Sequence, residues 1–118
     1  MTPIFFYIVM VQVALYTKHE VRGLSWSLGM SCASHKQITF RVEAKRVYQE
    51  VCALAIGVSY ELSCENYAGT GWSGNFLVIE NKAYCENFKG GFGTGFKETR
   101  TIKIEGNHIL ALVPKRSN

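Results

Sequence analysis

The chain has 118 residues, of which 47% are hydrophobic and 13% aromatic. This length is the usual size of one domain and too short for two independent cores, and the composition excludes a disordered chain, because disorder requires too few apolar residues to offset chain entropy. The net charge of +4 is mildly basic and compatible with an anionic partner.

The N-terminus carries an apolar run from Ile4 to Leu15 that only Gln12 interrupts, and the first charged side chain is Lys18. The run is shorter than the roughly 20 residues that a membrane-spanning helix needs, and its length is typical of the apolar core of a secretory signal peptide. We therefore expect residues 1–22 to be a signal peptide, with the cleavage site left open, and residues 23–118 to form the mature domain. The protein would then be secreted, without stable membrane insertion after cleavage. A buried first strand and an uncleaved membrane anchor are the alternatives.

Four cysteines lie downstream of this run, and an even number of cysteines in a small secreted chain predicts two disulfides. Three pairings are possible, and the sequence does not choose among them. No C-x-x-C and no paired histidines accompany the cysteines, so we expect neither a metal nor a cofactor. The residues expected to form disulfides are Cys32, Cys52, Cys64 and Cys85.

A helix is expected from Thr39 to Leu54, because apolar residues recur there at three- and four-residue steps and Gly57 can end the helix. After Gly57 the period changes to two, which is typical of a half-buried strand. Three further short strands, rich in β-branched and aliphatic residues, are expected at Phe76–Glu80, Thr101–Glu105 and Ile109–Val113. One helix followed by antiparallel strands predicts an α+β fold, with the helix packed on one face of the sheet.

Two segments carry a family resemblance: Ser59–Gly69 (SYELSCENYAG) and Gly90–Val113 (GGFGTGFKETRTIKIEGNHILALV). The first is similar to the second strand and base-recognition loop of the small guanyl-specific ribonucleases of fungi. The second is similar to their glycine-rich loop, arginine-bearing strand and last apolar strand. With Cys32 before the expected helix, the resemblance covers most of residues 30–115 and implies a microbial-ribonuclease-like fold with disulfides.

The catalytic residues that this resemblance implies are incomplete. Ribonuclease chemistry needs a base on the ribose 2′-hydroxyl, an acid on the leaving oxygen and a cation on the phosphate. Leu62 stands where the family carries its first histidine, and the second histidine would fall within residues 114–116 (Pro-Lys-Arg); none of these side chains exchanges a proton near neutral pH as imidazole does. The remaining candidates are Tyr60, Glu80 and Arg100, and the family's general-base glutamate aligns either with Glu80 or with Leu77. The resemblance therefore implies a protein that is not an enzyme.

The expected signal peptide, the short chain and a cysteine before the helix also resemble the secreted ribonuclease-like effectors of powdery mildews. The tripeptide from Met30 to Cys32 occupies the place of their Y-x-C motif. The resemblance implies a non-catalytic effector, extracellular or translocated into a host plant cell, that binds host RNA or a host protein and suppresses defence. We expect it to be a monomer.

Binding of RNA would use cations for the phosphates and aromatic rings for base stacking. The candidates, from the base-recognition loop and the C-terminal strands, are Asn66, Tyr67, Trp72, Lys97, Arg100, Lys103, Lys115 and Arg116. An active extracellular ribonuclease stays open if Glu80 and Arg100 converge on a cleft, as does a generic secreted interaction protein or toxin. A contiguous basic and aromatic surface would favour RNA, whereas an exposed apolar patch would favour a protein partner.

Overall fold

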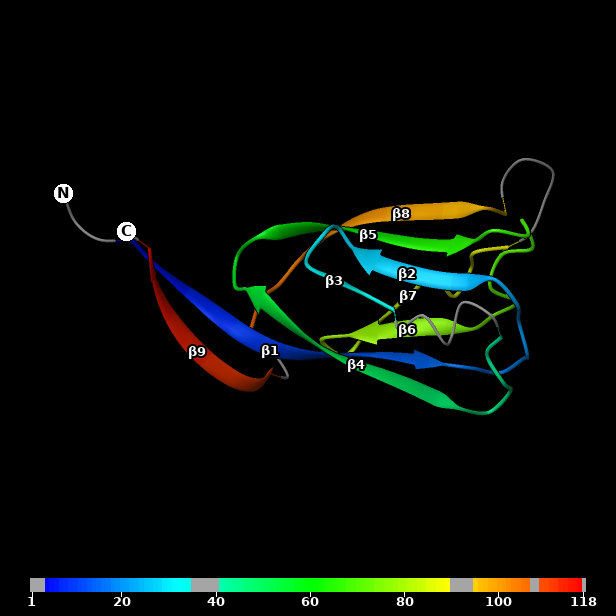
Figure 1. Cartoon of the computed structure of the whole chain (residues 1–118), viewed down its shortest axis with the longest axis horizontal. Helices are drawn as coiled ribbons and strands as arrows, with labels where there is room; N and C mark the ends of the chain where they lie inside the picture. Colours follow the sequence, from blue (N-terminus) through cyan, green and yellow to red (C-terminus); the bar gives the residue numbers. More distant parts are fainter. Residues whose placement is uncertain (1–3, 35–40, 90–94, 107–108, 118) are drawn as a thin grey trace.

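The structure, a computed structural model, describes residues 4–34, 41–89, 95–106 and 109–117. Within these residues the chain forms nine β-strands and no helix (Figure 1). The strands make two antiparallel sheets whose inner faces share one hydrophobic core. The expected α+β fold with one helix on a sheet is therefore wrong, and the microbial-ribonuclease-like architecture falls with it. The chain is an all-β sandwich.

Sheet A has five strands in the order β4–β1–β6–β7, with β9 paired to the N-terminal part of β1. Its strands are β1 (Ile4–Tyr16), β4 (Val47–Ala55), β6 (Phe76–Ile79), β7 (Lys82–Tyr84) and β9 (Ile109–Ser117). Sheet B has four strands in the order β3–β2–β5–β8. Its strands are β2 (Leu24–Leu28), β3 (Cys32–Ala33), β5 (Ser59–Asn66) and β8 (Lys97–Lys103).

The segment expected to be the C-terminal part of a helix is β4, which pairs with β1 along its whole length. Its side chains alternate between the two faces of the sheet: Cys52 and Leu54 are buried, whereas Val47 and Val51 are 47% and 51% exposed. Apolar residues therefore occupy both faces of this strand. Their combined spacing imitates the three- and four-residue steps of a helix, which is why the helix prediction failed.

The apolar run expected to be a signal peptide is β1, which lies between β4 and β6 in sheet A. From Val9 to Leu15 every second side chain, at Val9, Val11, Val13 and Leu15, is fully buried in the core between the sheets. The signal peptide at residues 1–22, with its cleavage site left open, stays a prediction. The buried-strand alternative describes what these residues do in the folded chain.

Two disulfides join the sheets, as the cysteine count predicts. Cys32 of β3 pairs with Cys52 of β4, and Cys64 of β5 pairs with Cys85, which follows β7. Each bond therefore ties one strand of sheet B to sheet A, and each is expected to stabilise the fold by about 3 kcal/mol by restricting the unfolded chain.

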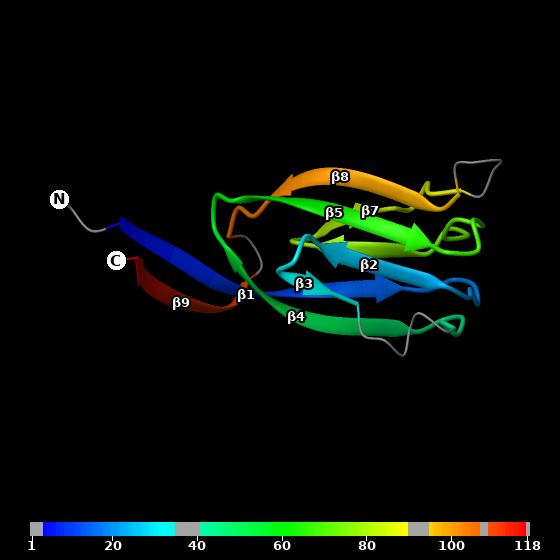
Figure 2. The same ribbon diagram turned by 45° about the horizontal axis from the view of Figure 1, so that its top comes forward.

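The molecule is elongated, with principal extents of 53 × 27 × 22 Å. The N-terminal part of β1 and β9 project together beyond the body of the sandwich, as both views show (Figures 1 and 2). The two sheets overlap in the other part of the molecule, where β1 continues between β4 and β6. The outer face of sheet A is formed there.

Candidate binding surface

The outer face of sheet A, defined here by the side chains of β1, β4 and β6 that point away from the core, carries no charged residue. The cross-strand register brings its members together: Val51 lies opposite Gln12, Gln49 and Val78 lie on either side of Ala14, and Val47 and Phe76 on either side of Tyr16. The whole set is Met10, Gln12, Ala14, Tyr16, Val47, Gln49, Val51, Ala53, Phe76 and Val78.

Large apolar side chains on this face are exposed to solvent. Val47 and Val51 are each about half exposed, and Tyr16 is 39% exposed. A sheet face that only meets water normally carries polar side chains, and contiguous exposed apolar residues mark surfaces of contact. The outer face of sheet A therefore has the properties of a binding surface.

An aromatic group stands at one end of the face. The rings of Tyr16 and Phe76 are stacked, with their centroids 5.5 Å apart, and the ammonium of Lys18 lies 5.6 Å from the centroid of Phe76. Phe76 thus contacts both an aromatic ring and a cation. The stacking on Phe76 restricts the Tyr16 ring, of which a part stays in solvent.

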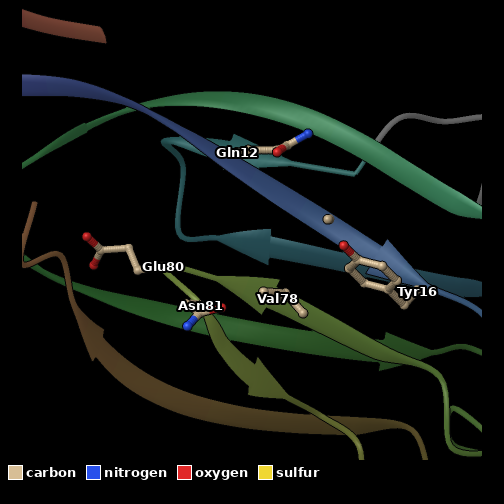
Figure 3. A pocket seen from close by; sticks show the side chains of 6 residues that line it. Gln12, Tyr16, Val78, Glu80 and Asn81 are labelled. Atoms are coloured by element: carbon tan, nitrogen blue, oxygen red, sulfur yellow. The ribbon is translucent and has the colours of Figure 1, made fainter. Parts of the chain in front are cut away.

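A shallow pocket of about 140 Å³ opens on the same face (Figure 3). Ala14 explains it: this small side chain lies between the larger Gln12 and Tyr16 on the same side of β1, so the sheet is hollowed at that point. In Figure 3 the Tyr16 hydroxyl points back along β1 in the direction of Gln12. The lining residues are Gln12, Ala14, Tyr16, Val78, Glu80 and Asn81.

The hairpin between β6 and β7 positions the remaining polar groups of the pocket. Glu80 and Asn81 have positive φ angles of 49° and 63°, as in the two-residue turns that match the twist of a β-hairpin. The Glu80 carboxylate accepts hydrogen bonds from the backbone N–H groups of Glu105 and Gly106, at 2.9 and 2.8 Å. These bonds orient the carboxylate, which is itself only partly exposed.

Two residues expected to contact RNA serve the fold instead. Trp72 is fully buried, and its indole N–H donates to the Glu65 carbonyl at 3.0 Å, so its ring offers no stacking surface. Asn66 is also fully buried, and its amide donates to Thr70 Oγ1 and to the Gly71 carbonyl. Both residues hold the loop between β5 and β6.

The exposed residues that were expected to bind RNA are not among those that line the pocket. Tyr67 is 79% exposed in the loop after β5, and Lys97, Arg100 and Lys103 lie on β8 of sheet B. The ammonium of Lys97 is 3.7 Å from Glu65, and the guanidinium of Arg100 is 3.7 Å from Glu98.

Lys115 and Arg116 complete the RNA candidates and lie in β9, opposite Phe6 and Phe5 in the backbone register. Their side chains are outside the described part of the chain.

The three residues taken from the ribonuclease resemblance have separate local contacts. The Tyr60 hydroxyl accepts a hydrogen bond from the backbone N–H of Ala55 at 2.8 Å. Glu80 follows β6 in sheet A, whereas Arg100 lies in β8 of sheet B. The described contacts of Glu80 and Arg100 are therefore with different partners, the backbone at Glu105 and the side chain of Glu98 respectively.

No known protein family matches the chain, and neither a curated protein nor a solved structure shows a match. The described part of the chain contains no cluster of three or more His, Cys, Asp or Glu side chains that could hold a metal ion. The same residues include no helix with the length and hydrophobicity needed to span a bilayer.

Gln12, Tyr16 and Asn81 line the pocket but were not among the residues selected from the sequence. Gln12 and Tyr16 belong to the run that was expected to be a signal peptide, so their side chains were set aside. The one available signal was Gln12, a polar residue inside an otherwise apolar run. In a strand, such a residue marks the face that points away from the core.

Proposed function

We propose that this chain is a non-catalytic binding module that contacts an uncharged ligand through the outer face of sheet A. The observation that carries the proposal is the combination of half-exposed Val47 and Val51 with the partly exposed ring of Tyr16 on a face without charges. Exposed apolar area that is held rigidly by a sheet is available for contact without a large ordering cost.

The distribution of charge argues for an uncharged ligand rather than RNA. RNA binding depends on cations that neutralise phosphates. Lys97 and Arg100 each lie near a glutamate of sheet B, whereas the outward residues of β1, β4 and β6 in the described chain include no cation, and Lys18, just beyond the end of β1, lies over the Phe76 ring. The RNA-binding effector role therefore stays a prediction, and it is one outcome of the test below.

The disulfides indicate the kind of cellular compartment in which the binding module acts. Disulfides persist in oxidising compartments and are rare in the cytosol, and each of the two bonds here links the two sheets. They are compatible with an extracellular protein, so we place the binding role outside the cytosol.

The test compares two variants with the same change on opposite faces. Val51→Glu places a carboxylate on the outer face of sheet A, and Thr101→Glu places one on the outer face of sheet B, at another exposed strand position. The oxidised full-length chain and both variants are passed over immobilised cellulose, chitin and β-1,3-glucan, which are uncharged, and over immobilised hairpin RNA at two salt concentrations. Circular dichroism checks that each variant is folded.

We expect the unmodified chain to be retained by at least one uncharged matrix, and retention to be lost in Val51→Glu and kept in Thr101→Glu. Three results would overturn the proposal: equal retention of both variants, retention by RNA alone, or no retention by any of these matrices.

A further inference from the structure

We infer that the pocket beside Ala14 binds one ring of a neutral carbohydrate, with the neighbouring sugar units lying along β4. This inference rests on the proposed binding role of sheet A and names the class of ligand. The pocket volume of about 140 Å³ is below the roughly 300 Å³ at which pockets begin to hold drug-sized ligands, so it suits a single small ring.

The hydrogen-bonding groups of the pocket match the hydroxyl groups of a sugar. Each hydroxyl both donates and accepts, so a site for several hydroxyls needs donors and acceptors close together. The amides of Gln12 and Asn81 and the hydroxyl of Tyr16 supply both kinds of group. With Glu80, four of the six lining side chains are polar, which distinguishes the pocket from the aliphatic surface around it.

The apolar lining matches the other half of a sugar ring. A pyranose ring carries C–H groups that pack against aromatic and aliphatic surfaces. The Tyr16 ring is held by its stacking with Phe76, and Val78 lies in register with Ala14 at the centre of the hollow. A ring bound there would bury part of the exposed surface of Tyr16 at little conformational cost, because that side chain is already fixed.

The charges around the pocket favour a neutral sugar over an anionic one. Glu80 is the charged residue among those that line the pocket, and its carboxylate would repel a phosphate, sulfate or uronate brought close to it. Its orientation is set by the two backbone N–H groups that it accepts from. The carboxylate points toward those N–H groups and away from Gln12 and Tyr16 (Figure 3), so it acts on a bound sugar through its charge and not through a direct hydrogen bond.

The register of sheet A gives the direction of a longer chain. Gln12, at one side of the pocket, lies opposite Val51 on β4, and Val47 lies opposite Tyr16. Both valines are about half exposed and uncharged, so they continue the surface from the pocket across the edge of the sheet. An oligosaccharide anchored in the pocket would lie over them.

The experiment measures the affinity of the oxidised full-length chain for soluble tetrasaccharides of cellulose, chitin, β-1,3-glucan and mannan by titration calorimetry. Gln12→Ala removes an amide that lines the pocket, and Asn87→Ala removes an exposed amide from the turn after Cys85, outside both the pocket and the outer face of sheet A. We expect Gln12→Ala to weaken the binding of the preferred tetrasaccharide about tenfold and Asn87→Ala to change it less than about twofold.

A second pair of variants avoids any effect on the sheet itself. Asn81 has a φ of 63°, which glycine adopts freely, so Asn81→Gly removes the amide while keeping the turn. Ser73→Gly makes the matched change at a φ of 54° in the loop before β6. We expect Asn81→Gly to weaken binding about threefold to tenfold and Ser73→Gly to leave it unchanged.

The outcomes separate this inference from the proposed function. If Val51→Glu abolishes retention but both pocket variants bind the tetrasaccharide as well as their controls do, the binding face stands and the pocket assignment is wrong. Binding of RNA, or of an acidic oligosaccharide in preference to all four neutral ones, would also overturn it. Loss of affinity confined to Gln12→Ala and Asn81→Gly supports it.

Discussion

The two outer faces of the sandwich are made by the same kind of secondary structure and carry opposite chemistry. On sheet B the outward residues of β5 and β8 are hydroxyl-bearing or charged, with Glu61 opposite Thr101 and Glu65 opposite Lys97. On sheet A the corresponding positions carry valine, alanine, glutamine and aromatic residues. Sheet B follows the usual alternation of an antiparallel sheet with one solvated face, whereas the outer face of sheet A carries mainly apolar residues together with two glutamines. This difference supports the proposal that the outer face of sheet A is a contact surface.

The largest effect on stability is expected from removing β1, which contributes to both faces of sheet A. A chain lacking residues 1–22 loses the strand that carries four fully buried side chains and that β4, β6 and β9 all pair with. We expect this chain to show no cooperative unfolding transition in urea. Removal of residues 1–3 alone is the control and should leave the transition intact. A cooperative transition in the chain lacking residues 1–22, with both disulfides formed, would contradict the placement of β1.

Neighbouring residues of β1 test the two sides of sheet A separately. Leu15 is fully buried, so Leu15→Ala should lower the free energy of unfolding by about 2–5 kcal/mol through lost burial and a cavity. Tyr16 points to the outer face, and Tyr16→Ala should cost about 1 kcal/mol, mainly from lost stacking on Phe76. Urea titrations of both variants measure these values. An equal or reversed order of the two costs would show that the faces are assigned the wrong way round.

The two disulfides join the two sheets, and removing one should lower the free energy of unfolding by a different amount from removing the other. The bonds close loops with sequence separations of 20 and 21, so loop entropy predicts a loss of about 3 kcal/mol for each. Cys64 and Cys85 are both buried, whereas Cys32 is partly exposed. Changing Cys64 and Cys85 to serine should therefore cost more than changing Cys32 and Cys52, because two hydroxyls are then buried. Thermal unfolding of the two double variants gives the order, and the reverse order would count against it.

The smallest expected effect comes from exchanging similar side chains between the faces. Val51→Thr and Thr101→Val each change an exposed strand residue to one of nearly the same shape, so the free energy of unfolding should move by no more than about 0.5 kcal/mol. Retention on a phenyl matrix should nevertheless fall for Val51→Thr, which removes a methyl group from the contact face. If retention follows Thr101→Val instead, the dominant apolar surface is not on sheet A.

Some of the fold follows from the sequence because it depends on local pattern. The alternation after Gly57 predicts β5, the short aliphatic runs predict β6 and β9, and the even cysteine count predicts two disulfides. The strand expected at Thr101–Glu105 is β8, which begins four residues earlier, at Lys97. These features need only neighbouring residues for their explanation.

The other features of the fold and the pocket depend on pairing between strands that are far apart in the sequence. A local sequence pattern does not contain this information. The four-residue spacing of Val47 and Val51 predicts one face of a helix, whereas in the structure both residues belong to a strand that pairs with β1. The apolar run at Ile4–Leu15 predicts a signal peptide because nearly all its residues are apolar, and that prediction is not tested by the structure. In the folded chain the same residues form β1, whose pairing with β4, β6 and β9 is not visible in the local sequence. The pocket combines β1 with the turn after β6, two segments about 65 residues apart, so its members could not be grouped from the sequence.

The central claim is that the outer face of sheet A is the contact surface, and nuclear magnetic resonance tests it most directly. Amide shifts of the oxidised, ¹⁵N-labelled full-length chain are followed while the neutral tetrasaccharide that binds best is added. The account predicts that the shifts concentrate at Gln12, Tyr16 and Val51 and at the Glu80–Asn81 turn, while Thr99 and Thr101 on sheet B stay in place. Shifts confined to sheet B, or no shifts with any of the four tetrasaccharides, would contradict it.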